Sequence, residues 1–145
     1  MRAPLLIAAL LGLQPAAGVA LTPAAPAEPF VIEYYYKVRW GHQEEFLTLF
    51  RKNHLPILEK EKAMGRILEI RAVAPRYHAT EESRWDFRVT IVFASVADAY
   101  SPGLSEAERR QLYPDQAAFA KEEQRRFEIL EAHWDVPLST LPLRP

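Results

Sequence analysis

The 145-residue chain contains no cysteine, and this absence excludes several kinds of chemistry. Without a thiol there is no disulfide, no thiolate nucleophile, no cysteine-ligated zinc or iron–sulfur centre, and no lipid attached through sulfur. An excess of one charge is also missing, because 18 basic and 19 acidic residues give a formal net charge of −1. This balance gives no general attraction to nucleic acids or acidic membranes, so we expect no nucleic-acid partner.

A long apolar run is lacking too, and the apolar segment that does occur lies near the N-terminus. Arg2 precedes an apolar stretch over residues 3–13, and small residues then lead to Ala20. The stretch is shorter than the roughly 20 residues that span a membrane. This order is typical of a secretory signal peptide, which we place at residues 1–20. We therefore expect a periplasmic or secreted bacterial protein with no membrane anchor after cleavage.

The rest of the chain is long enough for one domain, which we expect over residues 30–141. Residues 21–29 are rich in Pro and Ala and are expected to form a flexible leader, and residues 142–145 a tail. Aromatic and β-branched residues predict strands at 30–40, 67–75 and 85–93, and a final short strand at 133–141.

Apolar residues at helical spacing predict two longer helices between these strands. The first runs from about residue 43 to Gly65, with a kink near 53–55 because Pro56 lies inside it. Ser105 with Glu108 has the pattern of a capping box. The second longer helix would begin after Asp115 and continue to about residue 132. Its predicted inner face and C-terminal end hold Phe119, Phe127, Leu130 and His133.

The resulting order is β-α-β-β-α-β, which predicts an α+β protein with the ferredoxin-like fold, an antiparallel sheet with helices on one face. Alternation along the first strand sends Ile32, Tyr34, Tyr36 and Val38 toward the helices. The opposite face would collect polar and aromatic residues. They are Glu33, Tyr35, Lys37, Glu69, Arg71, Asp86 and Arg88. This face is either simply solvated or part of a site.

The segment EYYYKVRWGHQEEFLTLFRKNHLPIL, residues 33–58, resembles the opening of dimeric α/β-barrel proteins of the ferredoxin-like class. Stress-responsive barrel proteins, EthD-like proteins and antibiotic-biosynthesis-type monooxygenases belong to this group. The resemblance implies a homodimer in which two sheets pair face to face around a shared cavity. Tyr35, Arg71, Asp86 and Arg88 would then border that cavity.

Three groups of residues are candidates for chemistry or binding. Asp86 and Arg88, with Glu33 and Glu69 opposite, form a candidate acid–base cluster, or alternatively a charge network that sets the dimer register. His54 interrupts an apolar helical run and is either a catalytic or ligand-facing group or a hydrogen-bonded structural residue. Tyr77, with Trp85 and Trp134, could wall a pocket.

No HxH or HExxH pattern occurs, so we expect no metal site. Haem could bind only through His54 or His78, without a fixed motif to support it. The leading hypothesis is a homodimeric barrel that binds a small organic ligand, with cofactor-independent chemistry. The alternatives are a non-enzymatic module that binds a protein of the cell envelope, and a haem-binding barrel protein.

Overall fold

Strand β1 (Phe30–Val38) is central to the sheet of the computed structural model, which describes residues 27–144. It pairs on one side with β3 (Phe87–Phe93) and on the other with β4 (Leu130–Leu138). β2 (Ile67–Val73) forms the edge beside β3, and the three pairings are antiparallel. The order β2-β3-β1-β4 confirms the predicted ferredoxin-like arrangement. The predicted signal peptide lies outside the described residues.

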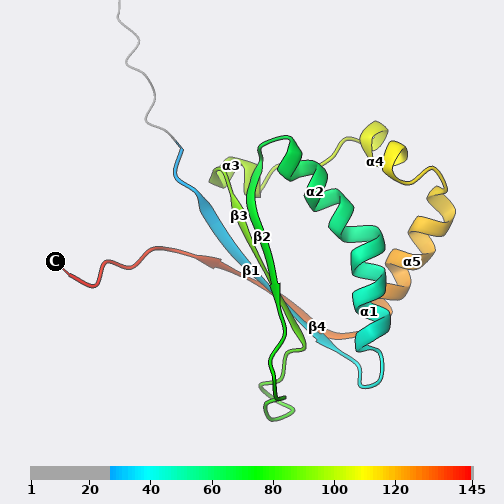
Figure 1. Ribbon diagram of the computed structural model, residues 1–145, viewed down its shortest axis with the longest axis horizontal. Helices are drawn as coiled ribbons and strands as arrows, with labels where there is room; N and C mark the ends of the chain where they lie inside the picture. Colours follow the sequence, from blue (N-terminus) through cyan, green and yellow to red (C-terminus); the bar gives the residue numbers. More distant parts are fainter. Residues whose placement is uncertain (1–26, 145) are drawn as a thin grey trace, which may run out of the picture.

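Figure 1 shows the helices packed on one side of this sheet. The first long helix of the prediction is α1 (Gln43–Leu49), a π-helical turn η1 (Phe50–His54) and α2 (Leu55–Ala63). After β3 come α3 (Val96–Ala99), α4 (Glu106–Leu112) and α5 (Gln116–Glu128). No helix in residues 27–144 is long and apolar enough to cross a membrane.

The predicted kink is confirmed as the π-helical turn. Pro56 lies in the first turn of α2, where its missing N–H costs least. The π-helical turn before it replaces the regular α-helical hydrogen-bonding pattern with a wider one. Within this turn, the carbonyl oxygen of Asn53 accepts a hydrogen bond from the Tyr113 hydroxyl (2.5 Å). Gly65 then follows α2 with φ +79°, a conformation that favours glycine.

The core lies between the sheet and the helices, as the alternation predicts. Its buried apolar residues come from β1, β2, β3, the helical segment 46–58 and the residue after α5. They are Ile32, Tyr36, Val38, Phe46, Phe50, Leu58, Ile67, Val89, Ile91, Phe93 and Ile129.

One departure from the predicted alternation occurs in β2. Leu68, which the alternation places against the helices, is 50% exposed, and Ile67 is buried instead. The register of β2 against β3 shifts between Ile67 and Glu69. Such a bulge adds one residue to a strand and reverses the local order of inward and outward side chains.

The end of the second long helix also differs from the prediction. α5 ends at Glu128, and Leu130 already pairs with Val38 in β4. Residues that the sequence assigned to the helix therefore pair with β1 instead. The Arg39 amide also donates a hydrogen bond to the Ile129 carbonyl (2.9 Å). Phe127, predicted on the inner face, is 54% exposed, whereas Ile129 is buried.

Candidate functional site

A cavity of about 230 Å³ lies between the helix-facing side of the sheet and helices α2 and α3. We call it the helix-side cavity. Its apolar wall comes from two elements of the helical layer and from β3: Ile57, Leu58, Val89, Ile91, Phe93 and Ala99. Its polar lining residues are Tyr34, Tyr36, His54, Glu61, Asp98 and Ser101. An apolar space with a few converging polar groups is the usual form of a small-molecule site.

His54 reaches this cavity because it is the last residue of the π-helical turn. Its ring packs against Phe50, with ring centroids 5.0 Å apart. Within residues 27–144 its ring makes no hydrogen bond, and it is one of the residues that line the cavity. Burial lowers the pKa of His54 to about 4. The imidazole is therefore neutral at pH 7 and can both donate and accept a hydrogen bond.

Tyr34 and Tyr36 place two phenol groups at the same cavity. Burial raises the pKa of Tyr34 to about 12, and it raises the pKa of Tyr36 well above its usual value. Both hydroxyls stay protonated, and neither makes a side-chain hydrogen bond to another residue of the described part of the chain. Two hydroxyls and one imidazole thus remain available to a ligand.

His133 supports these tyrosines from the neighbouring strand. Its ring stacks on Tyr36, with centroids 4.5 Å apart, and lies 6.5 Å from the Tyr34 ring. The prediction that His133 ends a helix is wrong, because the residue belongs to β4. The early start of β4 is the physical reason. Burial lowers the pKa of His133.

The other face of the sheet, which we call the open sheet face, carries no helix of the described chain (Figure 1). Its residues come from all four strands. They are Val31, Glu33, Tyr35, Glu69, Arg71, Arg88, Thr90, Val92, Trp134, Val136 and Leu138.

Three of the predicted site residues meet on this face. The Tyr35 hydroxyl donates to Glu33 Oε2 (2.6 Å), and the Arg88 guanidinium lies 3.2 Å from Glu33 Oε1. The Tyr35 ring stacks on Trp134 at 5.3 Å and meets the edge of Trp85 at 5.6 Å. Glu69 and Arg71 lie on β2, opposite Val92 and Thr90, and both are exposed.

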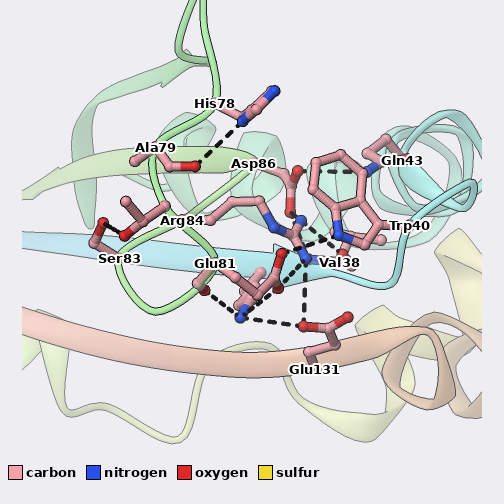
Figure 2. Close-up of polar contacts among 12 residues, drawn as sticks. Val38, Trp40, Gln43, His78, Ala79, Glu81, Ser83, Arg84, Asp86 and Glu131 are labelled. Carbon is pink, nitrogen blue, oxygen red and sulfur yellow. Dashed lines mark hydrogen bonds and ion pairs between the residues drawn. The ribbon is translucent and has the colours of Figure 1, made fainter.

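Asp86 does not join this group, and its predicted place in an acid–base cluster with Arg88 is wrong. Asp86 precedes β3, and its Oδ2 accepts from the Val38 amide (2.7 Å) and from Arg84 (2.6 Å). Figure 2 shows it in a separate network at the end of the sheet. There the buried Arg84 also donates to Glu81 (3.1 Å) and Glu131 (3.3 Å).

The remaining predicted residues lie in the loop before Arg84. Tyr77 is 87% exposed, so its ring lies in solvent rather than in a pocket wall. His78 is exposed and contacts the carbonyl oxygen of Ala79 through Nδ1 (3.2 Å; Figure 2). No group of three or more potential metal ligands comes together in the described part of the chain.

Sequence reasoning did not single out Tyr34, Tyr36, Glu61 and Asp98 as residues that line a cavity. The prediction that the two tyrosines face the helices is confirmed, since Tyr36 belongs to the buried core and Tyr34 packs against it. Their hydroxyls were the available signal, because a phenol on a buried face needs a partner or a cavity.

No protein-family model matches the chain, and no curated protein matches its sequence. Among solved structures, a dimeric ferredoxin-like protein from an uncultured marine organism is similar. The two share 7% identity, the match covers 81% of this chain and 93% of that one, and the TM-score is 0.52. This chain has the ferredoxin-like fold.

Two further solved structures are similar at lower scores. A NIPSNAP family protein from Agrobacterium tumefaciens shares 19% identity over 81% of this chain and 98% of its own, with a TM-score of 0.47. SnoaB from Streptomyces nogalater, a cofactor-independent oxygenase, shares 10% sequence identity with this chain. The match covers 82% of this chain and 99% of SnoaB, with a TM-score of 0.48.

Proposed function

We propose that the protein binds a small, single-ring organic molecule in the helix-side cavity. One observation carries the proposal: apolar walls surround two phenol groups and an imidazole that have no side-chain hydrogen-bond partner in residues 27–144. A ligand hydroxyl or carbonyl in the cavity would provide hydrogen-bond partners for these three groups. The volume of about 230 Å³ is below the roughly 300–1,000 Å³ of sites for drug-sized ligands, which favours a single ring.

The chemistry of His54 favours binding over base catalysis. A general base works best when its pKa lies near the working pH. With a pKa of about 4, His54 removes protons weakly at pH 7 but makes good neutral hydrogen bonds. We therefore propose cofactor-independent binding as the primary activity, with His54 and Tyr36 orienting the ligand.

A titration with 2-phenylethanol, followed by NMR shifts of the methyl groups of Val89 and Ile91, tests this proposal. Ala99→Phe would fill the cavity from α3 and should abolish the shifts. Ala120→Phe, at an exposed position of α5, is the matched control and should leave them unchanged. Equal binding by wild type and Ala99→Phe would overturn the proposal.

The alternative place for a ligand is the barrel interior predicted from the sequence, bordered by Tyr35 and Arg88. Arg88→Ala separates the two sites, because Arg88 belongs to the open sheet face and is not a lining residue of the helix-side cavity. Loss of 2-phenylethanol binding in Arg88→Ala, with retention in Ala99→Phe, would place the ligand on the open sheet face instead.

We also propose that two copies form a homodimer through the open sheet face. Large apolar side chains there are solvent-exposed in the single chain: Trp134 is 38% exposed, Val136 36% and Leu138 41%. Exposed apolar surface of this kind marks an interaction site. The similar marine ferredoxin-like protein is dimeric, which favours a second copy as the partner. Glu33 and Arg88 form an ion pair within one chain, so these two charges do not oppose the association of two open sheet faces.

Export to the periplasm or the medium is a separate proposal, supported by the sequence of residues 1–20. Mass spectrometry of the protein from the periplasmic and secreted fractions should find a chain that begins at Leu21. A full-length chain confined to the cytoplasm would refute export and leave the binding proposal untouched.

A further inference from the structure

We infer that the helix-side cavity selects a single-ring ligand with an alkylammonium side chain, and discriminates against a carboxylate. This inference rests on the proposed function, because it names the ligand class of the same cavity. It follows from the charges that face the cavity, which differ at its two ends.

At the end formed by α2 and α3, the cavity is lined by two carboxylates, those of Glu61 and Asp98. In residues 27–144 the Glu61 carboxylate has neither a hydrogen bond nor an ion pair. The cation that acts on it most, Arg66, donates its own hydrogen bond to the carbonyl oxygen of Gly103 (2.8 Å). Burial removes part of the solvent around the Glu61 carboxylate and thereby raises its pKa. An ammonium group placed beside it would relieve this cost.

Asp98 is held in place by its own helix. Its Oδ2 accepts from the Ser95 hydroxyl (2.6 Å), and the Ser95 side chain in turn caps α3 by accepting from the Asp98 amide (3.1 Å). The carboxylate therefore keeps acceptor capacity for a ligand, since each carboxylate offers about four lone-pair positions.

The other end of the cavity offers an anion no compensating charge. His54 is neutral there, and Arg126, the guanidinium that acts on His54, is already held in a two-point contact with Glu123 (2.9 and 2.7 Å). His133 faces Asp135 at 3.3 Å on β4. A ligand carboxylate would thus meet hydroxyls at one end and two carboxylates at the other.

The aromatic walls suit the same ligand. Tyr34, Tyr36 and Phe93 line the space, and the face of an aromatic ring attracts a cation. A ring seated against Val89 and Ile91 would leave its amine pointing to Glu61. Charge-assisted hydrogen bonds are roughly twice as strong as neutral ones, so we expect an amine to bind about five- to ten-fold more tightly than the matching alcohol.

Three probes of nearly equal size test the inference at pH 7.5: 2-phenylethylamine, 2-phenylethanol and phenylacetate. Isothermal titration should give the order amine, alcohol, carboxylate. Glu61→Gln should lower the amine-to-alcohol affinity ratio at least about three-fold. Glu59→Gln, at an exposed position of the same helix, should leave the ratio unchanged.

The outcomes separate this inference from the proposed function. Binding of the alcohol without any preference for the amine, or an unchanged ratio in Glu61→Gln, would overturn the charge selection alone. Binding of none of the three probes would overturn the cavity proposal as well. A tighter binding of phenylacetate would reverse the inferred ligand class.

Discussion

The guanidinium of Arg84 lies over the indole ring of Trp40, with Cζ 4.1 Å from the ring centroid. The same guanidinium donates to the carbonyl oxygen of Val38 (3.0 Å) and to the carboxylate of Asp86. Arg84 is only 1% exposed. The loop that precedes β3 is thereby fastened to the end of β1 (Figure 2).

The first prediction is that Arg84→Met destabilises the fold by about 3 kcal/mol. Removing one partner of a buried ion pair leaves the other charges without compensation, which costs more than the pair itself contributes. Urea unfolding followed by circular dichroism measures the change. Arg76→Met, at an exposed position of the same connection, is the control and should stay within about 0.5 kcal/mol of wild type. An equally small effect at Arg84 would contradict the structural role of the network.

The second prediction concerns the pH dependence of folding. His54 has a pKa of about 4 when folded and an ordinary value of 6.5 when unfolded. Between these values the unfolded chain binds more protons, so stability falls as the pH drops from about 6.5 to 4. The loss reaches roughly 3 kcal/mol, since each pKa unit corresponds to about 1.4 kcal/mol. His133 acts in the same direction, whereas Glu61, with a raised pKa, partly offsets them.

Unfolding free energies at pH 7.0, 5.5 and 4.5 test this second prediction. His54→Phe should flatten most of the slope, because phenylalanine does not titrate. His78→Phe, at an exposed loop position, should keep it. A slope that is the same in wild type and His54→Phe would show that the buried imidazole is not the titrating group.

The third prediction concerns the π-helical turn. Tyr113→Phe removes the hydroxyl that donates to the carbonyl oxygen of Asn53. An unpaired part-buried carbonyl costs about 1 kcal/mol, so the variant should unfold at a correspondingly lower urea concentration. Hydrogen exchange should also quicken in residues 50–57 and stay unchanged in β1. Uniform exchange across the chain would mean that the contact does not stabilise the turn locally.

The fourth prediction is that Leu138→Glu dissociates the proposed homodimer. Leu138 lies on the open sheet face, opposite Val31, and a buried carboxylate at the interface would have no partner. Light scattering after gel filtration should give twice the chain mass for wild type and the single-chain mass for the variant. Leu141→Glu, 78% exposed beyond β4, should remain dimeric. A monomeric wild type at micromolar concentration would refute the dimer.

Local signals predicted much of the fold. The alternation in β1 correctly placed Ile32, Tyr36 and Val38 against the helices. The capping box at Ser105 and Glu108 is present as predicted, because it depends only on two residues three positions apart in a single turn. These features could be predicted because the interacting groups are close in sequence.

The features that sequence missed depend on distant parts of the chain. The end of α5 is set by the pairing of Leu130 with Val38, and helical periodicity contains no information about that pairing. The helix-side cavity is a gap left where α2, α3 and the sheet meet, so no single segment reveals it. Asp86 was assigned to the wrong network because Arg84, in a polar connection, gives no local sign of burial.

The position of β1 at the centre of the sheet has a consequence for the timing of folding. Its partners, β3 and β4, begin at residues 87 and 130. The hydrogen bonds of β1 can therefore be completed only when β4, the last strand in the sequence, is available. Contacts between such distant segments slow folding, because closing the loop between them costs entropy before the strand pairing contributes any stabilisation. The chain must therefore be almost fully synthesised before the sheet can close, which leaves an interval in which a chaperone can bind the unfolded chain.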